Sequence, residues 1–365
     1  MDIITCWRYR RAGVLDYVPH PPAQKPREII KSGDGRMKIF KITFLILGLA
    51  LLGWVLKNTD LTEILNLLGE IGIGFLVILG IYFFAFLFDS LTWQLTVLSI
   101  PLTPKWLYHF FQMRLAGEAF NNILPAGSLG GEPIKAVLLK NLYGINYRDG
   151  VASLILARTI NTVALILFLF IGFYLMVHTA ILEEEYTTTA GIGLLTLTVL
   201  IFLFFSIQRF KIASQISETL SKKRGFQWLG GILHQIKDID GILVKFYKNH
   251  QGRAAYAFAL AFVNWVLGVG EIIITMHFLG HPITLTDAWI IEAAAQLVRA
   301  ATFFIPASIG AQEGAFLVIG SAVTGSPSLG ITMAIVRRAR EIIWVAWGIV
   351  AFYTTKKDNV FAKES

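Results

Sequence analysis

The sequence predicts an all-α polytopic membrane protein with about six full spans and two broken or re-entrant helical hairpins arranged as an inverted repeat. The first observation is composition: of 365 residues, 55% are hydrophobic and only 15% are charged. The second is that long stretches carry a single charge, as residues 151–182 do with Arg158. About 20 apolar residues cross a bilayer, so each such stretch is long enough to span. The third is that residues 125–132 and 306–313 repeat one pattern of Pro, Gly and Glu within apolar surroundings.

The chain begins with a polar, basic segment that contains no apolar core of a signal peptide. We expect residues 1–36 to be a disordered cytoplasmic tail; the alternative is that translation starts at Met37, after which the apolar residues begin. The membrane domain is expected over residues 37–353, followed by a cytoplasmic tail at 354–365.

The elements of this domain follow from the alternation of apolar runs with Pro, Gly and charged residues. After the first span comes an amphipathic interfacial segment at 58–72. The full spans are expected at about 39–56, 75–98, 151–177, 190–207, 254–278 and 331–353. One broken pair of short helices flanks Pro125, and a second flanks Pro306. Residues 209–253 form a basic amphipathic cytoplasmic insert.

Lys and Arg residues give the orientation, because they accumulate in cytoplasmic loops. Of the 32, 26 fall in the N-terminal tail, residues 99–148, the insert and the C-terminal tail. The opposite loops, 58–70 and 179–188, carry acids and no Lys or Arg. Both termini are therefore predicted to be cytoplasmic, in a cytoplasmic (inner) membrane. The formal charge of +8 fits basic loops beside anionic lipid, and we expect no nucleic-acid partner.

A duplication organises the chain. PAGSLGGE at 125–132 matches PASIGAQE at 306–313, and Arg158 and Arg338 each follow a Gly by eight residues. The repeat units are about 75–178 and 254–353. Their first spans run in opposite senses, so the units are inverted, and broken helices that meet near the midplane are typical of alternating-access transporters. The bends are expected at six residues: Pro125, Gly127, Gly130, Gly131, Pro306 and Gly310.

Glu132 and Glu313 are the first candidate site residues, because each lies where a Gly-rich bend leads into a helix. They could line a polar pocket for a lipid head group or a coupling proton, or each could cap its own helix. Arg158 and Arg338 suit a phosphate by bidentate hydrogen bonding, or they could pair with these two acids.

Other charges inside apolar runs are costly and need partners. Asp89 and Glu271 precede the two prolines by 36 and 35 residues and are candidate pocket acids. Glu118 and Arg299 each lie seven residues before a proline. They could pair across the pseudo-twofold or meet local partners such as Arg114 and Glu292.

A further charged group lies in the last span, beside Arg338. Arg337, Arg340 and Glu341 are expected near a helix end, snorkelling or making an i,i+4 pair between Arg337 and Glu341.

Several kinds of chemistry have no support in the sequence. The lone Cys6 excludes an intramolecular disulfide and a cysteine-based metal site. Metalloprotease, P-loop and nucleophile-elbow motifs are missing from the sequence. We expect no metal and no cofactor, and do not expect an enzyme.

Four segments carry a resemblance to a known family: NNILPAGSLGGEPIKAVLL, ASLILARTIN, FFIPASIGAQEGAF and AIVRRARE. They resemble the flippase-like transmembrane region of lysylphosphatidylglycerol synthases, which stand-alone bacterial and archaeal proteins share, hopanoid-associated members included. The resemblance covers about residues 37–353 and lacks a counterpart for the basic N-terminal tail. It implies translocation of a lipid or lipid-linked molecule and, without an aminoacyl-transferase domain, does not imply aminoacylation. The residues matching the family pattern are Pro125, Gly130, Glu132, Arg158, Pro306, Gly310, Glu313 and Arg338.

The favoured hypothesis is a flippase-like translocator whose midplane polar cavity opens to each face in turn. The expected partner is a membrane lipid of phospholipid, isoprenoid or hopanoid type. One alternative is a non-transporting scaffold that holds a lipid-modifying enzyme through residues 209–253. Another is an intramembrane lipid transferase with Glu132 as general base.

Overall fold

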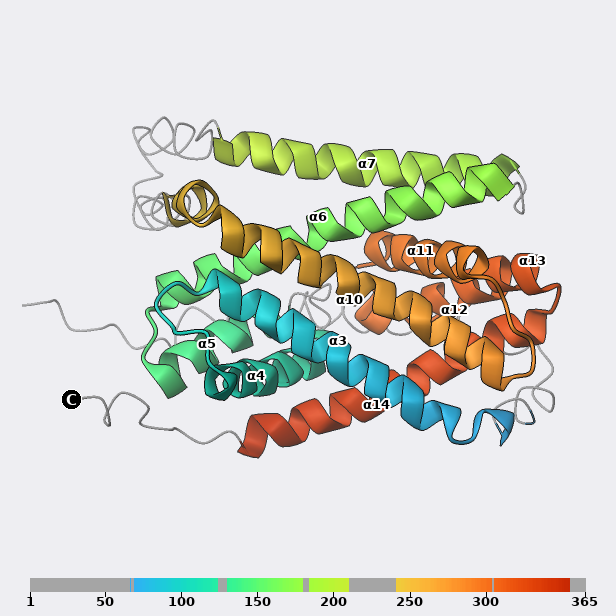
Figure 1. Cartoon of the computed structure of the whole chain (residues 1–365), viewed down its shortest axis with the longest axis horizontal. Coiled ribbons are helices and arrows are strands. Elements are labelled where there is room, and N and C mark those ends of the chain that lie inside the picture. The colour runs from blue at the N-terminus through green and yellow to red at the C-terminus, as the bar shows by residue number, and fades with distance from the viewer. Residues whose placement is uncertain are drawn as a thin grey trace, which may run out of the picture. The chain divides into compact units, whose positions relative to one another are not determined.

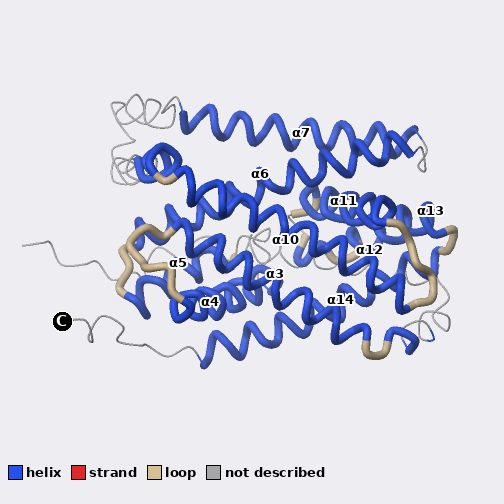
Figure 2. The backbone as a smooth tube through the Cα atoms, viewed as in Figure 1, coloured by secondary structure: helices blue, strands red, loops and turns tan. Residues whose placement is uncertain are grey.

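The computed structural model describes residues 66, 69–123, 130–179, 184–209, 241–303 and 305–354, all of which belong to one compact unit. Within these ranges the chain is helices, loops and turns, with no strand (Figure 2). The predicted all-α polytopic class is confirmed. The predictions for residues 1–36, for the first span, for Pro125 and Gly127, and for most of the insert lie outside the described residues.

The helices begin and end close to the predicted bounds. The first predicted unit contains α3 Gly74–Thr96, α4 Pro104–Ile123, α5 Gly131–Tyr143 and α6 Tyr147–Thr179. The connecting helix is α7 Glu184–Arg209. The second unit contains α10 Gln251–Phe278, α11 Leu285–Ala301, η1 Pro306–Ser308, α12 Ala311–Ala315, η2 Phe316–Gly320, α13 Ser321–Thr324 and α14 Pro327–Thr354. α14 starts four residues before its predicted bound because proline fits the first position of a helix.

Among the described residues, three helices, α3, α6 and α10, are long and apolar enough to cross a membrane. α3 and α10 pack antiparallel: Gly74, which opens α3, lies against the ring of Phe278, which closes α10. Near their other ends, Thr92 Oγ1 donates to the carbonyl of Ala257 at 3.5 Å. Large apolar side chains such as Phe170, Tyr174 and Trp347 remain exposed on the outside, as expected where lipid is the solvent.

The two broken segments lie toward opposite ends of the long helices. Figure 1 shows α4 and α5 toward one end and α11, α12 and α13 toward the other. α5 packs so closely on α4 that a Cβ on Gly131 would overlap the backbone of Gly117. In the second unit, a short α-helix, a π-helical turn and another short α-helix replace one regular helix. The helices thus follow one another in the same order in both units; their inverted placement in a membrane stays a prediction.

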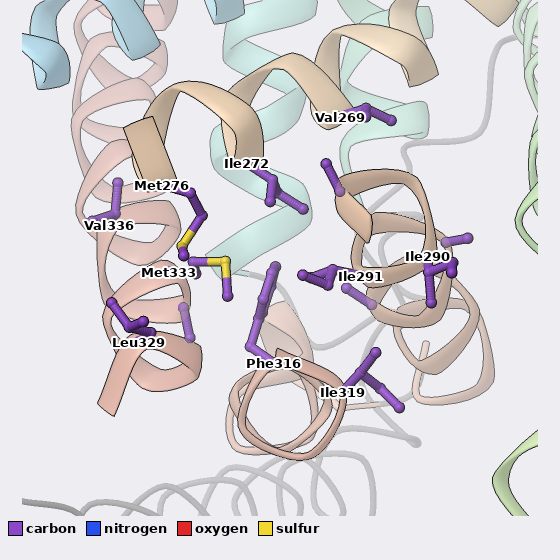
Figure 3. Close-up of a cluster of buried hydrophobic side chains, with 14 of the residues drawn as sticks. Val269, Ile272, Met276, Ile290, Ile291, Phe316, Ile319, Leu329, Met333 and Val336 are labelled. Carbon is purple, nitrogen blue, oxygen red and sulfur yellow. The ribbon is translucent and has the colours of Figure 1, made fainter. Parts of the chain in front are cut away.

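Among the described residues, the largest buried apolar cluster joins α10, α11, η2 and α14 (Figure 3) and also includes side chains of α3, α6 and α7. The ring of Phe316, 1% exposed, stands between the side chains of Ile291 and Met333. Lipid tails are as apolar as these side chains, so the cluster holds the helices by close packing rather than by exclusion of water. The ring of Phe316 also lies 4.8 Å from the guanidinium of Arg337, a buried charge of α14.

Candidate functional site: a charged cavity between the two units

A cavity of about 380 Å³ lies between α3, α4, α5, α6, α10 and α11. Its wall combines aromatic side chains, such as Trp93 and Trp265, with an unusual number of charges. Eight charged residues line it: Asp89, Arg114, Glu118, Glu132, Lys135, Arg158, Glu292 and Arg299. Five of the eight predicted site residues are therefore brought together here.

Arg114 organises the wall formed by α3 and α4. Its Nε forms an ion pair with Asp89, and its Nη1 donates to Glu118 Oε2 at 2.7 Å. Asn161 Nδ2 donates to Asp89 Oδ1 and Asn122 Nδ2 to Glu118 Oε1, each at 3.1 Å. Two acids share one guanidinium here, and the amides supply additional donors. Of the two alternatives for Glu118, the structure shows the local partner, Arg114.

Glu132 lies in the first turn of α5, as predicted. Its Oε1 accepts a hydrogen bond from Lys135 Nζ at 2.7 Å, one turn further along the helix. Lys135 is buried, and its ammonium lies 5.2 Å from the centre of the Trp93 ring. The backbone N–H of Gly131, one of the four that lack an intrahelical partner at the start of α5, donates to Asn121 Oδ1 at 2.7 Å.

Arg158 differs from every other cation of the wall. Its side chain is exposed and lines the cavity. Among the residues that the structure describes, no carboxylate forms an ion pair with it. The predicted alternative of a pair with Glu132 is not what this structure shows, because Lys135 occupies that carboxylate.

The matching residues of the second unit, Glu313 and Arg338, are paired. Arg338 Nε and Nη2 donate to Glu313 Oε1 at 2.9 and 2.5 Å. Glu313 Oε2 accepts from the N–H of Gly310 at 2.7 Å. Glu313, 4% exposed, is thus both a cap and an ion-pair partner, and it lies behind the cavity rather than in its wall.

The bend before Glu313 has an uncommon backbone. Ala307 and Ser308 have φ of 50° and 49°, and Gly310 has φ of 82°. Side chains with a Cβ enter this left-handed region at a cost of about 1–2 kcal/mol. Arg338 Nη1 donates to the Ala307 carbonyl at 3.2 Å and so holds the bend. Gly310 is therefore needed for its conformation, whereas Gly130, with φ of −62°, is not.

Arg337 and Arg340 correct a prediction. Both are 2% exposed, toward the middle of α14 rather than near a helix end, because α14 begins at Pro327, four residues before its predicted start. Arg337 does not pair with Glu341: its Nη2 donates to Glu271 Oε2 at 2.8 Å and also to Glu292. A buried guanidinium needs charged partners, and α10 and α11 supply them.

Two contacts connect the buried charges around Arg337 to the cavity. Glu292 touches Arg337 on one side and lines the cavity on the other, where Gln296 Nε2 donates to its Oε1 at 2.7 Å. Arg299 Nη1 lies 3.4 Å from Glu341 Oε1, so the ion pair of Arg299 in the described residues is with Glu341 rather than with Glu118 or Glu292. The remaining predicted residues, Glu271, Glu313 and Arg338, therefore lie directly behind the wall.

Among the residues that bind the acids of the cavity, sequence reasoning missed Lys135 and Gln296. Lys135 follows Glu132 by three residues, a spacing that places both on one face of α5. Gln296 follows Glu292 by four residues on α11, a spacing that also places both on one face of the helix. In an apolar helix, a polar residue one turn from a candidate acid is the signal that could have identified each.

Comparisons with known proteins agree with the fold. The family described as "Lysylphosphatidylglycerol synthase TM region" matches residues 39–348. The chain is similar to a UPF0104 membrane protein of Methanothermobacter thermautotrophicus (strain Delta H), at 22% identity over 274 residues, which cover 68% of this chain and 75% of that protein. No solved structure matches the chain.

Proposed function

The chain belongs to the lysylphosphatidylglycerol synthase transmembrane-region family, and on that premise we propose that it translocates a lipid or lipid-linked molecule across the cytoplasmic membrane. The observation that carries the proposal is the charged cavity between apolar helices. Its volume, about 380 Å³, is in the range of small-molecule sites. It would therefore take a polar head group, while the acyl chains stay against the apolar outer surface.

The proposal gives Arg158 the central role. A guanidinium that forms no ion pair with any described carboxylate can offer its planar donors to a phosphate. Glu132, on the same wall, would balance charge or take up a proton. Arg338 and Glu313 would hold the bend of the second unit rather than bind the head group, because each is already engaged.

Alternating access would follow from the placement of the broken segments. α4 and α5 lie toward one end of the long helices and α11 to α13 toward the other. In the proposed orientation, with both termini cytoplasmic, each segment would close the cavity from one face of the membrane. The proposal assigns no catalytic step to the chain.

Transport in proteoliposomes tests the proposal. Purified protein is reconstituted with a fluorescent phospholipid, and movement between leaflets is followed by dithionite quenching. We expect Arg158→Ala and Glu132→Gln to abolish the movement, whereas Lys248→Ala, an exposed cation outside the cavity, should move lipid like the wild type. Unchanged rates in both cavity variants would contradict the residue assignment.

The two other hypotheses give different results in the same preparation. A transferase would leave a covalently altered lipid that mass spectrometry detects. A scaffold would move no lipid, and deletion of residues 210–240 would release its enzyme partner from membranes. A translocator should keep its activity in vesicles after that deletion.

A further inference from the structure

The two predicted units use matched Glu and Arg positions differently. Glu313 and Arg338 follow Glu132 and Arg158 by 181 and 180 residues, at the start of α12 and within α14. In the second unit the pair is formed by two hydrogen bonds, at 2.9 and 2.5 Å. In the first unit Glu132 is bound to Lys135 instead, and Arg158 faces the cavity.

Lys135 accounts for the difference. The position that matches it in the second unit is Phe316, which carries no charge; its ring lies 4.8 Å from the Arg337 guanidinium. Lys135 lies one turn after Glu132, where a lysine is a natural partner. The stem of Lys135 packs beside Gly117, so its ammonium is held near the carboxylate. Besides Lys135, Arg158 lines the same cavity as Glu132, and only one of the two can be the main partner of Glu132.

We propose that Glu132 alternates between Lys135 and Arg158, and that its transfer to Arg158 expels a bound anionic head group. This rests on the proposed lipid translocation and gives a residue-level means of release. In the state described here, Arg158 is open to an anion. In the other state, Glu132 makes with Arg158 the pair that Glu313 makes with Arg338. A carboxylate and a phosphate compete for the same planar donors, so the two states exclude each other.

The exchange also fits the charge of the wall. The carboxylate stays within the cavity in both states, so the switch moves no net charge into the apolar bundle, where an unpaired charge is costly. After the exchange, the ammonium of Lys135 stays over the face of the Trp93 ring, which attracts a cation. The second unit has no competing lysine, and its Arg338 stays paired.

Removal of Lys135 tests the exchange by binding. In Lys135→Met, Glu132 should hold Arg158 permanently. We expect the affinity of the full chain in detergent for dioctanoyl phosphatidic acid, measured by titration calorimetry, to fall about tenfold. The double variant Lys135→Met, Glu132→Gln should recover to within about threefold of the wild type, because Arg158 is free again. Lys140→Met, at the exposed end of α5, is the matched control and should bind normally.

Either of two results overturns the proposal: wild-type affinity in Lys135→Met, or no recovery in the double variant. The second result would mean that Lys135 itself binds the anion. If Lys135→Met does not fold, Lys135→Gln removes the charge and keeps a polar end.

A thermal-stability cycle separates this inference from the transport proposal, because it needs no lipid. Glu132→Gln, Arg158→Met and their combination are measured in the wild-type and Lys135→Met backgrounds. We expect the changes in Tm to add in the wild type and to be non-additive without Lys135, where the pair forms. Additive changes in both backgrounds overturn the exchange. Non-additive changes in Tm without Lys135, together with no lipid binding and no lipid movement, would support the exchange and contradict the lipid function.

Discussion

The side chain of Glu292 lies directly over Gly268: a Cβ at position 268 would come within 2.6 Å of Glu292 Oε1. Glu292 is 1% exposed and is fixed by Arg337 and Gln296. These two contacts therefore hold the carboxylate of Glu292 in place. The glycine on α10 is what allows a carboxylate on α11 to reach the guanidinium on α14.

Gly268→Ala should accordingly break this connection. We expect the free energy of unfolding to fall by about 1–3 kcal/mol, as for other overpacked sites, measured by thermal or denaturant unfolding in detergent. Gly270→Ala is the control, because nothing lies within 4 Å of a Cβ at that position in the same helix. Alanine favours a helix over glycine by up to about 1 kcal/mol, so the control should be neutral or slightly more stable. Equal behaviour of the two variants would show that Glu292 is free to move.

Arg337 is expected to be the most costly charge to remove. Arg337→Met leaves Glu271 and Glu292, both buried, without this guanidinium. Loss of one member of a buried ion pair costs about 3–5 kcal/mol, to be measured as a loss in the free energy of unfolding. Arg158→Met removes the same chemical group from an exposed site without an ion pair to any described residue, and should change stability by no more than about 0.5 kcal/mol.

Neutralising Glu292 completes that test. Glu271 keeps a second partner, because Arg340 Nε lies 3.2 Å from its Oε1. Adding Glu292→Gln to Arg337→Met should restore part of the lost stability, because an amide tolerates burial better than a carboxylate. If the double variant is less stable than Arg337→Met alone, burial of an unpaired carboxylate is not the cause.

The bend at Gly310 gives a prediction about the backbone. Gly310→Ala places a Cβ at φ of 82°, and the free energy of unfolding should fall by about 1–2 kcal/mol. Gly314→Ala, four residues later in α12, meets nothing within 4 Å and has no positive φ, so it should not destabilise the protein. A Tm for Gly310→Ala at or above that of Gly314→Ala would rule out a conformational need for glycine at the bend.

The long helices were predictable because their signal is local. α3, α6 and α10 follow from apolar runs with one charge or none over most of their length. The broken segment around Pro306 follows from Pro and Gly in such a run. The positions of Glu132 and Glu313 in the first turns of α5 and α12 follow in the same way.

The ion pairs were not predictable in full, because they join residues far apart in the chain. Arg337 meets Glu271 and Glu292 across 66 and 45 positions, and no spacing rule of a single helix finds such partners. Sequence alone also placed these charges too near a helix end, because α14 begins at Pro327, four residues before the predicted start of the last span. The need for Gly131 comes from the approach of Gly117 on another helix, not from a turn.

The π-helical turn at Phe316–Gly320 changes the directions in which the side chains of the following helix, α13, point. A wider turn accommodates about one extra residue, so the faces of α13 are rotated by roughly 100° from where an unbroken α-helix would present them. Phe316, at the start of this turn, faces the interior, and Gly320, at its end, meets Gly330 of α14 at close range. Deleting one residue from this turn would therefore misalign the close contact between Gly320 and Gly330 and leave the bend at Gly310 unchanged.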